Sequence, residues 1–458
     1  MSDMFRNHHA PPKKIVRDPV QFWLSDLRFN ADMECMSVLQ GKSIIQQLDK
    51  YSLNATAVKN GIDTIRSESH LISSEFSKLF NVLADNKTPL KIPVVNQLTF
   101  LGQSFSRLVD LALGFLVQKV ITALDDANNP ISLSTSIGTV VSLGLEGEHM
   151  CYIIAREGGV RALLDICKMS GLDFAHAKAL RALATICCVA ESIFEIEKEG
   201  GVDCLTDILC DVKCKENVKG EVAGVIAQVT SPCLENLQQL SGLVDNMEDI
   251  LRALLGLCNS TRSHEVFLLA AAAIANITFM DSLACDILLQ YDAPRILIQS
   301  CGTQIADSLF VKDQVATILA NMVAADSCRV GVIENNGIEA CLGLLEEHPS
   351  NYKKPTELAA CERIQQKAAI ALTRICRDVE TAQMITEFQG IPRLVQLCKN
   401  TMERNKSDAV LVACLAALRK IISLYRPNDI TDTDYQQLVQ PKLMDSFLIC
   451  TNTDENFV

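Results

Sequence analysis

The chain has 458 residues, of which 48% are hydrophobic and only 5% are aromatic, and its formal net charge is −13 at pH 7. This length is ample for a large core built from aliphatic side chains. The acidic balance argues against nucleic acid as the main ligand, because neutralising phosphates requires a basic face.

The first 45 residues fall into two parts. Residues 1–17 are polar and are expected to be disordered, and their start has no apolar core of the kind a signal peptide needs. Residues 18–45 open with Asp18, a good N-cap, and Pro19, which suits the first position of a helix. One apolar face of a short helix follows, formed by Val20, Trp23, Leu24 and Leu27.

This short helix is too short to be stable alone in water. It contains the only Trp of the chain, and a less helical stretch with two acids among apolar residues follows it. Two interpretations are open. The helix docks on the rest of its own chain, or it is a linear motif that orders on a partner, with Trp23 as the binding hot spot.

Residues 46–128 carry helical periodicity, with turn signals near Pro89 and Pro130. The second helix is expected to run from near Pro93 to Leu124. Because the terminal units of a repeat array are atypical, we expect this helical hairpin to cap the array that follows.

A short phrase recurs along residues 129–425. It reads Ala155-Arg-Glu-Gly-Gly-Val-Arg-Ala-Leu-Leu, recurs closely after Glu197, and has weaker copies after Ile333 and Glu387. Ala-rich apolar helices alternate with these copies. Two helices joined at a sharp Gly turn, then a long Ala-rich third helix, with a period of roughly 40–47 residues, are typical of an armadillo-type solenoid. We therefore predict an all-α, right-handed superhelical solenoid of about six repeats plus a partial one, and such folds usually bind other proteins.

Two landmarks set the register of the repeats. One is a polar residue in the middle of each Ala-rich helix, and the other is a turn residue at a similar distance after it. The polar series is Ser142, Thr185, Gln228, Asn276, Asn321, Arg374 and Arg419, and the turn series is Gly158, Gly200, Ala293, Gly337 and Gly390. The longer interval between Asn321 and Arg374 is assigned to extra loop residues at 348–355, since insertions in solenoids map to loops.

The polar series is a candidate ligand site on the concave groove. Asn276 and Asn321 can bond the backbone of an extended ligand, or they can satisfy groups of neighbouring helices, and both interpretations stay open. Arg374 and Arg419 favour an acidic or phosphorylated ligand at the C-terminal end, because Arg pairs bidentately with carboxylate and phosphate. The alternative is that both pair with acids of adjacent helices.

Other chemistry finds little support in the sequence. The common hydrolase, metal-protease, phosphate-loop and dinucleotide motifs are missing, so we expect neither an enzyme nor a cofactor. Most of the nineteen cysteines stand at apolar helix positions, such as Cys187, Cys204, Cys341, Cys376 and Cys414, which favours free thiols in a reducing compartment. The Ala run at 270–273 is too short for a membrane segment, so Ala272 is expected at a tight helix contact.

Residues 426–458 are expected to be a tail. It ends in Asn456, Phe457 and Val458, and a free carboxylate on an aliphatic residue can add as a strand to a PDZ domain. Asn456 stands where a common class of PDZ ligands has Ser or Thr.

Several stretches together resemble the Inscuteable family. They are the orders Val20-Gln-x-Trp-x-x-Asp-Leu and Glu34-Cys-Met-x-Val-Leu-Gln, and further segments such as Ala360-Cys-Glu-Arg-Ile-Gln-Gln. The resemblance implies a non-enzymatic adaptor for asymmetric cell division. It implies that the adaptor links the cortical polarity complex, through a Bazooka-type PDZ scaffold, to the TPR protein Partner of Inscuteable or LGN, and so orients the mitotic spindle.

Carried over by position, the residues that the resemblance places in the TPR groove are Val20, Trp23, Leu24, Leu27, Glu34, Cys35, Met36, Val38 and Leu39. It also implies a cytoplasmic protein recruited to the cell cortex, without membrane insertion, and it leaves higher-order assembly open. The competing hypothesis is a general armadillo adaptor of the catenin or importin kind, with an extended peptide in its groove. The third helices lack the Trp residues that an importin-like groove needs, which disfavours nuclear import.

Overall fold

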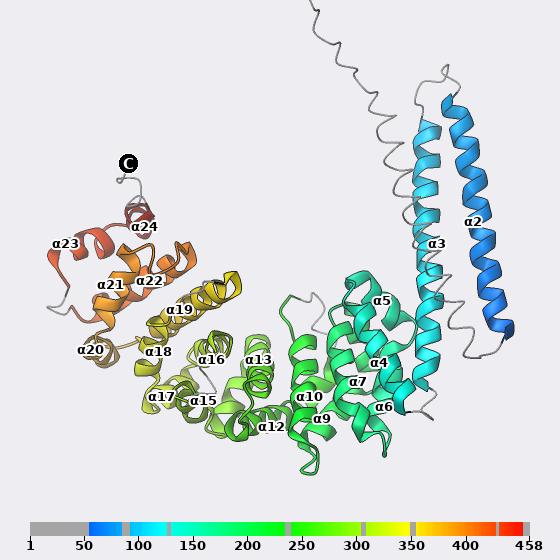
Figure 1. Ribbon diagram of the computed structural model, residues 1–458. Coiled ribbons are helices and arrows are strands. Elements are labelled where there is room, and N and C mark those ends of the chain that lie inside the picture. Colours follow the sequence, from blue (N-terminus) through cyan, green and yellow to red (C-terminus); the bar gives the residue numbers. More distant parts are fainter. Residues whose placement is uncertain are drawn as a thin grey trace, which may run out of the picture. The chain divides into compact units, whose positions relative to one another are not determined.

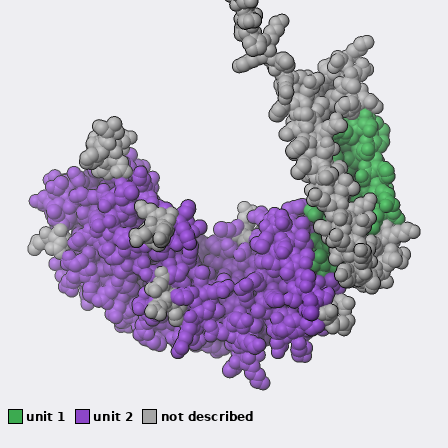
Figure 2. Space-filling view, in the orientation of Figure 1, with its two compact units in different colours: residues 1–120 green, residues 121–458 purple. Residues whose placement is uncertain are grey.

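The computed structural model describes residues 55–84, 92–125, 130–233, 240–303, 308–348, 354–426 and 430–451. The chain divides into two compact units, residues 1–120 and residues 121–458 (Figure 2). Every regular element in the described ranges is helical, which confirms the all-α prediction. The linear motif at 18–45 and the last residues of the tail lie outside the described residues.

The described part of unit 1 is a hairpin of two long helices, α2 (Ala55–Ala84) and α3 (Ile92–Asp125), which lie side by side in Figure 1. Buried residues that recur at helical spacing join them: Ile72 and Leu79 of α2 pack with Leu101 and Leu108 of α3. The observed bounds of α3 match the expected helix between Pro93 and Leu124. The role of this hairpin as a cap stays a prediction.

Unit 2 is a stack of helical repeats (Figure 1). A partial repeat, α4 (Pro130–Gly144), comes first. The next three repeats are α5 (Glu148–Arg156), α6 (Gly159–Lys168) and α7 (Asp173–Ile186); α8 (Ala190–Lys198), α9 (Gly201–Cys210) and α10 (Glu216–Val229); and α11 (Ser241–Asp245), α12 (Met247–Ser260) and α13 (His264–Met280). The last three are α14 (Leu283–Gln290), α15 (Ala293–Cys301) and α16 (Leu309–Met322); α17 (Asp326–Glu334), α18 (Gly337–Leu345) and α19 (Pro355–Ile375); and α20 (Val379–Glu387), α21 (Gly390–Lys399) and α22 (Asp408–Leu424). The described residues thus hold six three-helix repeats, as predicted.

The third helices form the spine of unit 2. Each packs on the next in the order α4, α7, α10, α13, α16, α19 and α22, and they lie along one side of the stack in Figure 1. Small side chains make this packing close: Ala270, Ala271 and Ala273 of α13 are fully buried. Ala272 is only partly buried. It lies four residues before Asn276, on the partly exposed stripe of α13 that we call the open stripe. The expectation that Ala272 stands at a tight contact is therefore wrong by one residue.

The sharp turn between the first two helices of a repeat makes two separate demands on adjacent residues. The first residue has a left-handed backbone: Gly158 and Gly200 in the early copies, and Asp292, Asn336 and Gln389 in the later ones, with φ of 61–63° in the last three. The second residue opens the next helix. The predicted turn series mixed these two positions, because it took the first in two copies and the second in three.

The second position is crowded by the preceding helix. A Cβ at Gly390 would lie 2.6 Å from Ile385 Cγ2 and 2.7 Å from the Ile385 carbonyl oxygen. The same β-branched neighbour stands five residues earlier in three other copies, as Ile154, Ile196 and Val332. In the copy where the residue is Ala293, that neighbour is Leu288, which has no γ-methyl on a branched Cβ. Gly is thus required by close approach, and the positive φ falls on its predecessor.

A matched pair of substitutions in α18 tests this division. Gly337→Ala should lower the free energy of unfolding by about 1–3 kcal/mol, because the new methyl would overlap Val332 Cγ1 and lie 2.5 Å from the Val332 carbonyl oxygen. Gly343→Ala in the same helix should raise it by about 0.5–1 kcal/mol, because its methyl would meet nothing within 4 Å. Denaturant unfolding followed by far-UV circular dichroism checks both. Equal effects would contradict the close-approach account.

The extra length of the fifth repeat is mostly helix. α19 has 21 residues where α16 has 14, and it begins at Pro355, a favourable first position. The prediction that the extra residues form a loop at 348–355 is therefore wrong for most of them.

The region expected to be a tail continues the fold as far as residue 451. Residues 430–451 contain α23 (Asp432–Asp434), a π-helical turn η4 (Tyr435–Val439) and α24 (Leu443–Thr451). Both η4 and α24 pack on α22, and α23 packs on η4. Leu438, Ser446 and Cys450 are buried in this contact. These residues cover the exposed end that the last repeat would otherwise present.

Candidate partner-binding surface

The described candidate residues form a ladder along the third helices. Thr185 lies on α7, Gln228 on α10, Asn276 on α13, Asn321 on α16, Arg374 on α19 and Arg419 on α22, one from each repeat. Four of them lie in the last turn of their helix rather than in its middle. The candidates of the N-terminal motif and of the C-terminus are outside the described residues, so their roles stay predictions.

Three ladder residues reach back to the preceding third helix by the same route. Asn276 Nδ2 donates to the Ala227 carbonyl at 2.8 Å, and Asn321 Nδ2 donates to the Ala275 carbonyl at 3.3 Å. Arg374 Nη1 donates to the Ala320 carbonyl at 2.5 Å. In each case the acceptor residue directly precedes the ladder residue of the previous repeat.

Two of these three bonds have a simple physical cause. Ala227 and Ala320 are among the last four residues of α10 and α16, and carbonyls there have no amide partner within their own helix. A polar side chain from the next repeat supplies that partner. Of the two interpretations left open for the asparagines, the structure shows the bond to a neighbouring helix. Thr185 Oγ1 instead donates to Arg181 of its own helix.

Arg419 is the exception at the end of the ladder. Its Nη2 donates to Ser446 Oγ of α24 at 2.7 Å, and its Nε is buried without a partner. Burial lowers the pKa of Arg419 from its ordinary value. The expectation that Arg374 and Arg419 both face a ligand, or both pair with acids of adjacent helices, is therefore corrected: α24 covers Arg419.

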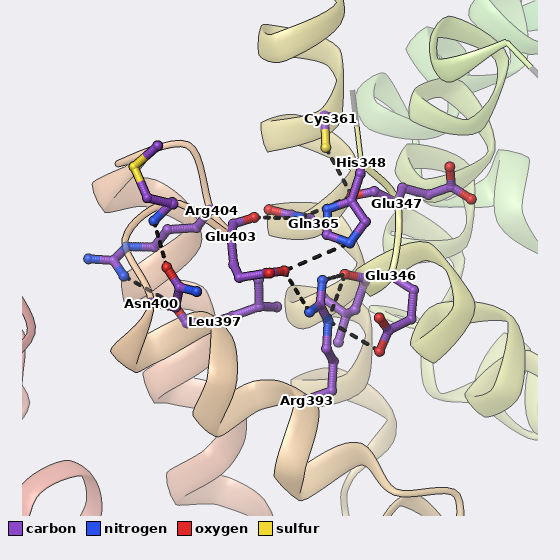
Figure 3. A network of polar contacts seen from close by, with 12 residues as sticks. Glu346, Glu347, His348, Cys361, Gln365, Arg393, Leu397, Asn400, Glu403 and Arg404 are labelled. Atoms are coloured by element: carbon purple, nitrogen blue, oxygen red, sulfur yellow. Dashed lines mark hydrogen bonds and ion pairs between the residues drawn. The ribbon is translucent and has the colours of Figure 1, made fainter. Parts of the chain in front are cut away.

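A second polar network joins the fifth and sixth repeats (Figure 3). The Arg393 side chain on α21 is 6% exposed, and its Nε and Nη2 donate to the Leu345 carbonyl at 3.1 and 2.7 Å. Its Nη1 donates to Glu403 Oε2 at 2.9 Å. Gln365 Nε2 of α19 donates to the carbonyls of Glu347 and Glu403, each at 3.2 Å. Loops that follow α18 and α21 are thus held together through side chains of α19 and α21.

A buried arginine continues this arrangement toward the C-terminus. Arg404 is 1% exposed, and its Nη1 donates to the carbonyls of Leu397 and Cys398 at 3.1 Å each, at the end of α21. Its Nη2 donates to the Cys450 carbonyl of α24 at 3.4 Å. Neither buried arginine was predicted from the sequence. For Arg393 the available signal was an Arg within the apolar run that follows Gly390.

The comparisons with known proteins identify the family. A family model described as Protein inscuteable C-terminal matches residues 35–458, and a second, described as Inscuteable LGN-binding domain, matches residues 15–54. The chain belongs to the Inscuteable family. Two relatives, the protein inscuteable homologs of Mus musculus and Homo sapiens, are each 46% identical to it over 370 residues, which are 81% of this chain. The chain spans 64% of the length of these curated Inscuteable relatives.

Solved structures agree with the fold of this Inscuteable-family chain. The crystal structure of an engineered protein superposes with a TM-score of 0.60 at 21% identity, over 77% of this chain and 85% of that one. A designed armadillo repeat protein gives a TM-score of 0.46 at 21% identity, over 57% of this chain and 98% of that one. The three-helix repeats themselves, stacked through their third helices, make unit 2 an armadillo-type solenoid.

The cysteines behave as small core residues. All eighteen cysteines in the described ranges are free, and most are buried. Burial raises the pKa of Cys341 and of Cys414 to about 12, so these thiols stay protonated and unreactive at neutral pH. Across the described ranges, His, Cys, Asp and Glu form no group of three or more that could hold a metal ion. No helix in those ranges is both long and apolar enough to cross a bilayer.

Proposed function

We propose that the protein is a non-enzymatic adaptor that joins LGN, the TPR protein also called Partner of Inscuteable, to the cortical polarity complex and thereby orients the mitotic spindle. The observation that carries the proposal is the match of residues 15–54 to an LGN-binding domain, beside a solenoid of a fold that usually binds proteins. Under this proposal the protein acts in the cytoplasm and is recruited to the cell cortex during asymmetric division.

The LGN arm is assigned to the short helix of the N-terminal motif. Its apolar stripe, Val20, Trp23, Leu24 and Leu27, lies within the matched segment. The acidic stretch after it, with Glu34, Cys35, Met36, Val38 and Leu39, continues along the TPR groove. A segment that orders on binding loses conformational entropy, so a few large anchors must supply most of the affinity.

Trp23→Ala should weaken binding of the full chain to the LGN TPR domain by more than about 2 kcal/mol, roughly 30-fold in Kd. Ser25→Ala is the matched control, because Ser25 belongs to the same predicted helix and lies off its apolar stripe. Isothermal titration calorimetry measures both. An unchanged Kd for Trp23→Ala would remove the LGN arm from the proposal.

The polarity arm is assigned to the solenoid, and the scaffold it recruits is a Bazooka-type PDZ protein. An alternative attachment is the C-terminal sequence Asn456-Phe457-Val458 on a PDZ domain. Deleting Phe457 and Val458 separates the two. Scaffold capture that survives the deletion supports the solenoid, and capture that is lost assigns the site to the C-terminus.

A further inference from the structure

The open face of α19 is a row of cations. Residues spaced by three and four along this helix share one face, and here they are Arg363, Lys367, Ile370 and Arg374. Arg377 follows two residues after the helix ends at Ile375. All five are exposed or partly exposed, and the side chains of Arg363 and Arg377 are 49% and 51% accessible. No acid stands on this stripe, although the whole chain carries a net charge of −13.

Acids that lie off this stripe pair with Arg363 and Arg377, whereas the stripes of the neighbouring third helices carry no acid. The corresponding stripe of α22 holds Ala409, Val412, Ala416, Lys420 and Ser423, and that of α16 holds Phe310, Gln314, Thr317 and Asn321, again without an acid. Asp313 of α16 is 3% exposed and lies below the surface, where it accepts from Arg363 Nε at 2.7 Å. Asp326 lies 3.8 Å from Arg377 and also pairs with Arg329 at 2.6 Å.

The first half of the same surface is built differently. There Arg181 of α7 pairs with Glu221 of α10 at 2.5 Å and with Glu265 of α13 at 3.1 Å. The hydrogen bond that Arg181 donates to the Glu221 carboxylate raises the pKa of Arg181, as expected of a satisfied pair. One cation thus meets two acids across three successive helices. The charge of Arg181 is therefore balanced by acids of the same surface.

We propose that this basic band, defined as Arg363, Lys367, Arg374, Arg377 and Lys420, docks an extended acidic segment of a partner protein. Arg363 and Arg377 already have acidic partners, so an acidic ligand would mainly neutralise Lys367, Arg374 and Lys420. Phe310 and Val412 flank the band and are 37% and 42% exposed, so they offer contacts for apolar residues between the acids. The inference deepens the proposed function, since the ligand class is that of the partner recruited by the solenoid.

The test uses the full chain and a labelled peptide of about 12 alternating Glu and Ala residues, about 40 Å long when extended. The comparison peptide has Gln in place of every Glu. Fluorescence anisotropy should give a Kd about tenfold lower for the Glu peptide, and the difference should shrink as salt screens the charges. Equal binding of the two peptides would overturn the proposal.

The variant is Lys367→Glu with Lys420→Glu. These two lysines lie on different helices, and Arg363, which pairs with the buried Asp313, is left unchanged. It should weaken binding of the Glu peptide by about tenfold or more. Lys367→Gln, which removes charge without adding an acid, should give a smaller loss. Lys213→Glu with Lys215→Glu, in the exposed loop between α9 and α10, makes the same change in net charge and should bind as wild type.

Two further sets of measurements test whether the basic band binds a different ligand and whether it acts independently of LGN binding. Self-association of the chain that the double variant abolishes, or an oligothymidylate that competes as strongly as the Glu peptide, would overturn the acidic partner segment. The double variant should still bind the LGN TPR domain, with unchanged far-UV circular dichroism. Trp23→Ala should leave binding of the Glu peptide intact, so that failure of one arm is distinguishable from failure of the other.

Discussion

Ala271→Asp should unfold unit 2 or lower its free energy of unfolding by more than about 4 kcal/mol. Ala271 is fully buried on α13, between the third helices α10 and α16 that pack on either side of it. A carboxylate there would replace a hydrogen of the methyl group in a close helix contact. Burial would disfavour its charged form, so the pKa of the introduced carboxyl should rise and the loss should be smaller in acid.

Ala272→Asp is the matched control for that substitution. The two alanines are adjacent and the new side chain is the same, but Ala272 lies on the open stripe with Asn276. Its loss should be about 1 kcal/mol or less, since the carboxylate keeps access to water. Thermal and urea unfolding by far-UV circular dichroism measure both variants. Equal losses would show that burial is not the cause.

Arg393→Ala should cost about 3–5 kcal/mol, the range for removing one partner of a buried ion pair. The substitution leaves the Leu345 carbonyl, at the end of α18, and the Glu403 carboxylate without their donor. It also opens a cavity between the fifth and sixth repeats (Figure 3).

Two comparisons sharpen this prediction. Arg393→Lys should recover only part of the loss, because an ammonium cannot reproduce the planar fork that binds a carbonyl and a carboxylate together. Arg295→Ala removes an exposed pair with Asp292 on α15, where the side chains are 46% and 49% accessible, and should change stability by less than about 1 kcal/mol. Unfolding curves in urea check all three. A loss for Arg393→Ala no larger than for Arg295→Ala would disprove the role of the network.

The repeat turns show a limit of structure prediction from sequence patterns. In Gly158-Gly159 and Gly200-Gly201 both residues tolerate a left-handed backbone, so the sequence does not say which one adopts it. The later copies resolve the question only in three dimensions, where Asn336 takes the positive φ and Gly337 the close approach. The predicted turn residues therefore differ by one position between copies, although the spacing of the repeats was predicted correctly.

The ladder shows a second limit. The pattern placed one polar residue on each third helix, but the acceptor of Asn276 lies 49 residues away in the chain and that of Arg374 lies 54 residues away. No local sequence signal distinguishes a side chain that caps a neighbouring helix from one that is free to bind a ligand. The contact between Arg419 and Ser446 was not predicted either, because residues 430–451 were expected to be a tail.

By itself the sequence determined the helical class, the number and spacing of the repeats, the burial of the cysteines, and the family through the motif that begins at Val20. These follow from helical periodicity, from Ala and Gly placed at recurring positions, and from local residue order, none of which needs distant contacts. Only the tertiary structure decided which alanine of α13 is buried, which arginines are enclosed, and which cations remain on the open face. Those properties depend on which helices become neighbours, because burial and pairing are set by the packing of segments far apart in the chain.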